Sequence, residues 1–103
     1  MEAPVMAGFV QIIEVKTSRI DEMDAFVEER RASGAPMPMV RATMTADRDR
    51  PGYYLSILEF DSYEEAMENS QKPETAEMAG RMASLGDGPP KFYNLDVRRT
   101  EER

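Results

Sequence analysis

The sequence predicts a single α+β domain of the ferredoxin-like type, in which a four-stranded antiparallel sheet carries helices on one face. The first observation is the βαββαβ order of strand and helix patterns within 103 residues. The second is a pair of β-rich runs, 38–46 and 53–60, joined by the charged turn 47–52. The third is length, since a chain of this size forms one domain with one core. The domain should span 1–103, with tails at about 1–7 and 98–103.

The first strand and helix are expected in residues 9–34. Residues 9–15 are rich in β-branched side chains and apolar on both faces, which is typical of a central strand. Ser18 is expected to cap the following helix. Gly34 is expected to end it, since glycine is the preferred residue just after a helix. The apolar stripe of this helix consists of Ile20, Met23, Phe26 and Val27.

Two further strands should pair in the middle of the chain. The prolines at 36 and 38 favour an extended connection, which leads into a strand over residues 39–45. The next strand, 53–60, is apolar on both faces and should be the second central strand. Ser62 or Asp61 should cap the helix that follows, and Glu65, three residues after the serine, completes a capping box.

The second helical region should be broken, because proline favours the first turn of a helix and disfavours its interior. Pro73 therefore divides the region into helices at about 62–70 and 73–85. The Asp-Gly-Pro-Pro sequence at 87–90 stops the second helix, and residues 92–97 form the last strand.

Composition excludes several kinds of chemistry. The chain has no cysteine and no histidine, which removes disulfides, thiolate nucleophiles, cysteine-ligated metals and the histidine ligand of haem. The net charge of −7, with bases scattered among acids, argues against nucleic-acid binding. No apolar run is long enough to span a membrane and no leader pattern opens the chain, so a cytoplasmic protein is the default expectation.

Three short segments resemble one family. Residues 59–66, Glu-Phe-Asp-Ser-Tyr-Glu-Glu-Ala, are similar to the junction of strand three and helix two in the antibiotic biosynthesis monooxygenase-like group. In that group a Glu-(Trp/Phe)-x-Ser segment ends the strand and opens the helix. Residues 70–75 resemble the kink in the second helical region, and residues 92–97 resemble the last strand. The resemblance covers about 8–97.

The resemblance implies a homodimer in which two sheets face each other as a barrel, with the helices outside. It also implies a pocket between sheet and helices, where active members oxidise aromatic quinol-type or polyketide substrates with O₂ and without metal or flavin. No cofactor is therefore expected. Phe60 stands where several active members have tryptophan, and Ser56 falls near the asparagine of others. Haem degradation is rejected because the chain lacks histidine.

The candidate substrate-binding residues are Tyr54, Ser56, Phe60 and Asn69. The first three share one face of a strand by parity, and if Phe60 faces the helices the other two do as well. Tyr54 and Ser56 could hydrogen-bond the phenol or carbonyl of a small aromatic ligand, and Asn69 could orient a carbonyl near the kink. Alternatively, Tyr54 is a packed aromatic side chain and Asn69 caps a helix end. No residue is identified as the catalytic base.

Charged side chains inside predicted strands have two interpretations. Glu14, Arg41 and Glu59 either form an acid–base or anion-binding site, or they belong to no site and are paired across the dimer barrel or simply exposed. Asn94 and Tyr93 point to opposite faces of the last strand, so at most one of them lines the pocket. Two functions remain open: a cofactor-independent monooxygenase, or a non-catalytic dimeric α/β-barrel protein that binds a small hydrophobic ligand or has an accessory role.

Overall fold

The computed structural model describes residues 8–34 and 37–102. The predicted tail at 1–7, the proline at 36 and the last residue lie outside the described residues. The elements are β1 (Phe9–Lys16), α1 (Ile20–Ala32), β2 (Arg41–Ala46), β3 (Tyr53–Phe60), α2 (Tyr63–Ser70), α3 (Pro73–Ser84) and β4 (Lys91–Asp96).

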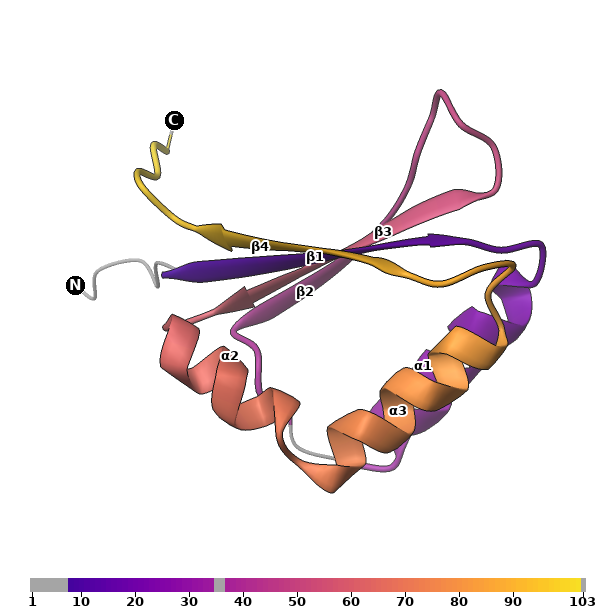
Figure 1. Ribbon diagram of the computed structural model, residues 1–103, viewed down its shortest axis with the longest axis horizontal. Helices are drawn as coiled ribbons and strands as arrows, with labels where there is room; N and C mark the ends of the chain where they lie inside the picture. Colours follow the sequence, from indigo (N-terminus) through magenta and orange to yellow (C-terminus); the bar gives the residue numbers. More distant parts are fainter. Residues whose placement is uncertain (1–7, 35–36, 103) are drawn as a thin grey trace.

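The four strands form one antiparallel sheet in the order β2-β3-β1-β4. The three helices all lie on one side of it, with α2 under one end and α1 and α3 together under the other (Figure 1). The ferredoxin-like α+β fold is therefore confirmed. The central positions of β1 and β3 are confirmed as well.

The register assigns each strand residue to a face, because directly opposed residues of antiparallel strands point to the same side. Phe9 lies opposite Phe60, and both are buried in a cluster with Ala66 of α2, so this set faces the helices. The alternate residues form the open face. There Val10 lies opposite Glu59, and Glu59 lies opposite Arg41.

The start of α2 is as expected and the start of α1 is not. The Ser62 hydroxyl accepts a hydrogen bond from the Glu65 backbone N–H at 3.1 Å, which confirms the predicted cap. The predicted Ser18 cap is wrong, because Arg19 occupies that position and has no capping side chain. The Thr17 hydroxyl, which is buried, accepts the Arg19 backbone N–H at 2.9 Å instead, while Ser18 is exposed.

Other boundaries shift by one or two residues. β2 begins at Arg41 rather than at residue 39, because Met39 turns inward to pack against the buried cluster of Phe9, Phe60 and Ala66. β4 begins and ends one residue earlier than predicted, where its pairing with β1 stops. The break at Pro73 is confirmed, and Gly34 has the expected positive φ of 78° after α1.

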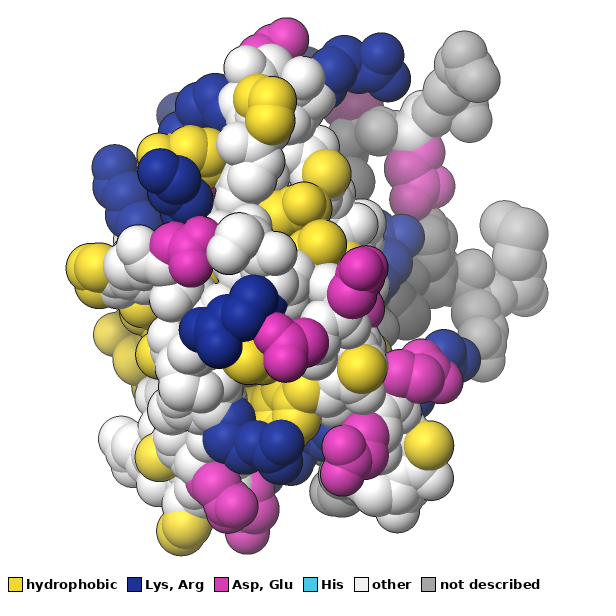
Figure 2. All heavy atoms as spheres, turned by 90° about the vertical axis from the view of Figure 1, so that its right-hand side faces the viewer, with side chains coloured by type: hydrophobic (Ala, Val, Ile, Leu, Met, Phe, Trp, Pro, Cys, Tyr) yellow, Lys and Arg dark blue, Asp and Glu magenta, His cyan; other side chains and the backbone are white. Residues whose placement is uncertain are grey.

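The surface at the α1–α3 end mixes both signs of charge. Lys and Arg side chains intermingle with Asp and Glu side chains over this end, with apolar side chains between them (Figure 2). No helix in the described part of the chain is both long and apolar enough to cross a membrane.

Candidate functional site

The middle of the helix-facing sheet surface remains accessible between two buried groups. Phe9 and Phe60 are buried at the α2 end, whereas Val15 and Phe26 are buried at the α1–α3 end. Phe9 and Val15 are six residues apart on β1, or roughly 20 Å along the strand. The side chains that lie between them on this face of β1 and β3 are only half-buried, although both strands are central: Gln11, Ile13, Ser56 and Leu58.

Tyr54 and Ser56 lie on this surface, as expected from strand parity. They are neighbours on one face of β3, roughly 7 Å apart along the strand. The Ser56 hydroxyl lies 3.1 Å from the Met44 sulfur on the adjacent edge strand. Both Tyr54 and Ser56 are half-buried, so solvent reaches them from the helix side.

Gln11 was missed by the sequence reasoning. Its amide nitrogen donates to the Asn94 side-chain oxygen at 3.0 Å, which joins β1 to β4 on the helix-facing surface. Of the two neighbouring residues Tyr93 and Asn94, Asn94 therefore faces the helices and Tyr93 faces the other way. The alternation of strand one already put Gln11 on the Phe9 face, but only the register brings it beside Asn94.

The other two candidates do not join Tyr54 and Ser56. Phe60 is 2% exposed and packs against Phe9 with ring centroids 6.4 Å apart, so it closes one end of the surface. The Asn69 side-chain oxygen accepts from the Thr75 hydroxyl at 3.2 Å. This bond links the end of α2 to the first turn of α3, and it is a contact between two side chains rather than the helix cap considered as the alternative for Asn69.

The charged strand residues form pairs on the open face. Arg41 donates to both carboxylate oxygens of Glu59, at 2.5 and 3.1 Å. This hydrogen bond lowers the pKa of Glu59 and raises the pKa of Arg41. Glu14 accepts from Arg50 at 3.0 Å. These charges therefore pair within one chain, whereas pairing across a barrel stays a prediction, and they lie on the side of the sheet away from Tyr54.

Arg50 organises the end of the open face near the β2–β3 turn. It donates to Asp47 at 2.8 Å as well as to Glu14, and its guanidinium lies 4.3 Å from the Tyr53 ring centroid. The hydrogen bond from Arg50 lowers the pKa of Asp47. On β4, the hydrogen bond with the Tyr93 hydroxyl raises the pKa of Lys91. These contacts hold charges in place on the face of the sheet opposite to α1, α2 and α3.

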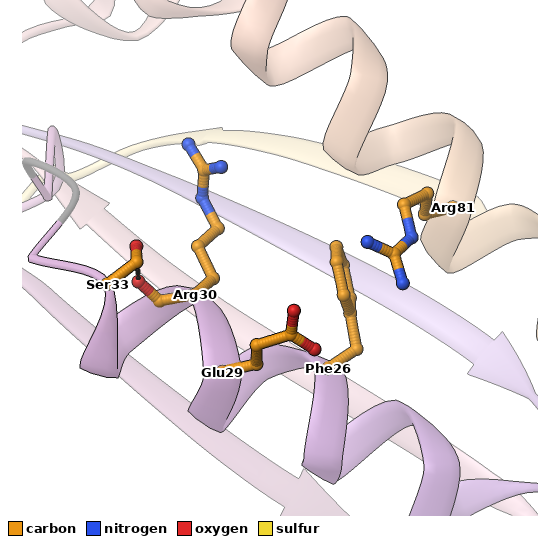
Figure 3. A pocket seen from close by; sticks show the side chains of 5 residues that line it. All are labelled: Phe26, Glu29, Arg30, Ser33 and Arg81. Atoms are coloured by element: carbon orange, nitrogen blue, oxygen red, sulfur yellow. Dashed lines mark hydrogen bonds between the residues drawn. The ribbon is translucent and has the colours of Figure 1, made fainter.

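A pocket of about 160 Å³ opens between α1 and α3. Figure 3 shows the Phe26 ring between the Glu29 carboxylate and the guanidinium of Arg81. The Arg81 guanidinium carbon lies 4.1 Å from the centroid of that ring. The sequence did not predict this pocket, because Arg81 comes from another helix. The spacing of the lining residues from α1 does place those residues on one face of that helix. Its lining residues are Phe26, Glu29, Arg30, Ser33 and Arg81.

The described residues offer no group of three or more carboxylates that could hold a metal ion. On the helix-facing surface the polar groups near the middle are hydroxyls and amides. Such groups can bind and orient a phenol or a carbonyl.

The comparisons with known proteins bear on the fold. No family model matches the chain, and no curated protein is similar to it. Among solved structures, the monooxygenase from the ActVA-Orf6 gene of Streptomyces coelicolor, in complex with nanaomycin D, has a TM-score of 0.73 and 21% identity over 94% of this chain and 93% of that one. A variant of SnoaB, a cofactor-independent oxygenase from Streptomyces nogalater, has a TM-score of 0.70 and 16% identity over 91% of this chain and 97% of that one.

A conserved protein from Methanosarcina mazei, with no activity in its name, has a TM-score of 0.64 and 5% identity over 87% of this chain and 93% of that one. At these identities the likeness concerns the fold. The strand order, the broken second helical region and the structural neighbours agree with the resemblance of residues 59–66. The chain has the fold of the antibiotic biosynthesis monooxygenase-like proteins.

Proposed function

We propose that the chain is a cofactor-independent monooxygenase that oxidises an aromatic quinol or polyketide-type small molecule on the helix-facing surface of its sheet. One observation carries the proposal. The central strands β1 and β3 leave half-buried polar side chains between the two buried groups, where a closed core would be dry and apolar. The activities named for the two Streptomyces neighbours support it.

The reaction requires few protein groups. An activated methylene, as in an anthrone, is acidic enough to lose a proton to water, which gives a stabilised carbanion that reduces O₂ directly. The balance is R₂CH₂ + O₂ → R₂C=O + H₂O. Tyr54 and Ser56 would hydrogen-bond the substrate oxygen, which stabilises the negative charge that develops there when the proton leaves. Glu14 and Glu59 are unsuited as bases, because they lie on the opposite face of the sheet.

The test is O₂ uptake with anthrone- and quinol-type substrates. Tyr54→Phe and Ser56→Ala should each lower kcat/KM by about tenfold to a hundredfold, because each removes one hydrogen bond to a developing charge. Tyr53→Phe is the matched control, since Tyr53 is the next residue of β3 and faces the other way. Equal loss in the Tyr53 and Tyr54 variants, or no uptake by the wild-type protein, would count against the proposal.

The alternative is a non-catalytic protein that binds a small hydrophobic ligand. The observation that favours it is the burial of Phe60, which occupies the place of tryptophan in several active members and is 2% exposed. A ligand on the sheet surface would not touch it. Binding of an anthrone-type ligand that depends on Tyr54, without O₂ consumption, would establish this alternative.

We also propose that a second copy of the chain covers the open face of the sheet, so that two sheets form a barrel. No helix formed by residues 8–34 or 37–102 lies over this face (Figure 1). Its centre is apolar, with Val10, Ile12, Leu55 and Ile57 at most half-buried, and Leu95 is 44% exposed at its edge. Apolar side chains on both sides of a sheet are typical of a sheet covered on both sides.

Ile57→Asp should disrupt this assembly, because a carboxylate would be placed in the apolar centre of the interface. Sedimentation or light scattering at micromolar concentration would show the monomer. Ala79→Asp, at an exposed position of α3, is the control and should stay dimeric. A wild-type protein that is already monomeric at this concentration would contradict the dimer proposal.

A further inference from the structure

The pocket between α1 and α3 has the features of a ligand site that is separate from the sheet surface. Its α1 side consists of residues at positions i, i+3, i+4 and i+7, which form one face of a helix. Its α3 side is the Arg81 side chain. The floor is the ring of Phe26, which is 9% exposed.

Arg81 packs over the Phe26 ring, but its charge and those of Glu29 and Arg30 are not neutralised by ion pairs in the described part of the chain. Among the residues that the structure describes, the ion pairs include neither Arg30 nor Arg81, and Glu29 also has no cation within ion-pair distance. Arg31, the neighbour of Arg30, does pair, at 3.8 Å from Glu28. Arg30 is nevertheless half-buried, while Arg31 has an exposed side chain.

The lining carries a net positive charge in a protein whose net charge is −7. Two guanidiniums stand against one carboxylate, and a guanidinium offers a planar fork of donors that matches a carboxylate. The Phe26 ring is 9% exposed and lies under the Arg81 guanidinium, so it offers a ligand a small apolar surface beside that charge. A cavity of about 160 Å³ holds a ligand of one ring rather than a polycyclic molecule.

We propose that Arg30 and Arg81 bind the carboxylate of a small aromatic acid in this pocket, with the ring beside the exposed part of Phe26. The Glu29 carboxylate weakens this binding through its like charge, and so limits the site to anions that both guanidiniums can reach. The proposal does not depend on the oxidation proposed above, because its residues lie on α1 and α3 and not on the sheet.

The experiment is a titration of the full chain with benzoate, in which binding is measured by calorimetry and by NMR chemical-shift changes. Arg30→Gln and Arg81→Gln should each weaken binding by about tenfold, since each removes a charge-assisted hydrogen bond. Glu29→Gln should tighten binding several-fold by removing the like charge. Arg30→Lys and Arg81→Lys keep the charge without the fork and should fall between wild type and the glutamine variants.

Two controls separate this site from others. Arg31→Gln removes the neighbouring charge of the same helix and should leave benzoate affinity unchanged. Tyr54→Phe should also leave it unchanged, because that residue belongs to the sheet surface. Acetate, which lacks the ring, should bind about tenfold more weakly than benzoate.

Three results would overturn the proposal. The first is no benzoate binding by the wild-type protein, and the second is an equal loss of benzoate affinity in the Arg30 and Arg31 variants. The third is a loss of benzoate affinity in Tyr54→Phe that the arginine variants do not share. The last result would place benzoate on the sheet surface. A lack of O₂ uptake would not contradict the proposed carboxylate site, and a lack of benzoate binding would not contradict the proposed oxidation.

Discussion

Thr17 should be one of the most sensitive positions in the chain, because its hydroxyl closes the end of the molecule where β1, α1 and α3 meet. The side chain is 3% exposed. Its hydroxyl donates to the Leu85 carbonyl at 2.6 Å and accepts from the Arg19 backbone N–H at 2.9 Å. Both partners are main-chain groups at helix ends, one before α1 and the other just after α3.

Thr17→Val keeps the shape of the side chain and removes the hydroxyl. The Leu85 carbonyl then loses its donor and the Arg19 N–H loses its acceptor. Leaving a buried polar group without a partner costs roughly 1 to 3 kcal/mol, so two such groups should lower the free energy of unfolding by about 2 to 6 kcal/mol. This is a large fraction of the roughly 5 to 15 kcal/mol that stabilises a typical domain.

The assay is urea unfolding followed by circular dichroism, at one fixed protein concentration because self-association would add to apparent stability. Thr17→Ser is the matched control, since it keeps the hydroxyl and loses one methyl group. Its cost should be about 1 kcal/mol. If the free energy of unfolding of Thr17→Val lies within about 0.5 kcal/mol of the wild-type value, the Thr17 hydroxyl does not stabilise the contact between these elements.

Three further outcomes are expected. Ser62→Ala should lower stability by about 1 kcal/mol through loss of the α2 cap, whereas Ser70→Ala at the exposed end of that helix should be nearly neutral in urea unfolding. Gly8→Ala should cost about 1 to 3 kcal/mol in thermal unfolding, because its Cβ would lie 2.4 Å from the Asp61 carbonyl oxygen. The Arg41 pair lowers the pKa of Glu59, so its stabilisation is complete above the unfolded pKa and disappears as pH falls through the folded pKa. The difference in stability between wild type and Glu59→Gln should therefore be present at neutral pH and vanish in acid; a constant difference would contradict the sign.

Local chemistry made most of the elements predictable. The range of β3, the cap at Ser62 and the break at Pro73 each depend on residues that are neighbours in sequence. Turn residues, caps and strand alternation act over a few positions, so they can be recognised without the fold. The prediction failed at Ser18, where a side chain of the right type was exposed and the buried Thr17 took the contact.

The candidate site was only partly predictable. Parity placed Tyr54 and Ser56 together on β3, because alternation is a property of a single strand. The contact of Gln11 with Asn94, which are 83 positions apart, required the register of β1 with β4. Whether Phe60 would reach a ligand depended on the packing of Phe9 and Ala66 around it, which no local pattern specifies.

The sequence by itself determined the fold class, the order of elements and the absence of thiol and imidazole chemistry, since these follow from local periodicity and composition. Tertiary structure alone decided which charges pair on the open face, which polar groups share the helix-facing surface, and that Arg81 lies over Phe26 of another helix. The physical reason is that such contacts join residues distant in the chain, and their geometry is set by how the helices pack on the sheet.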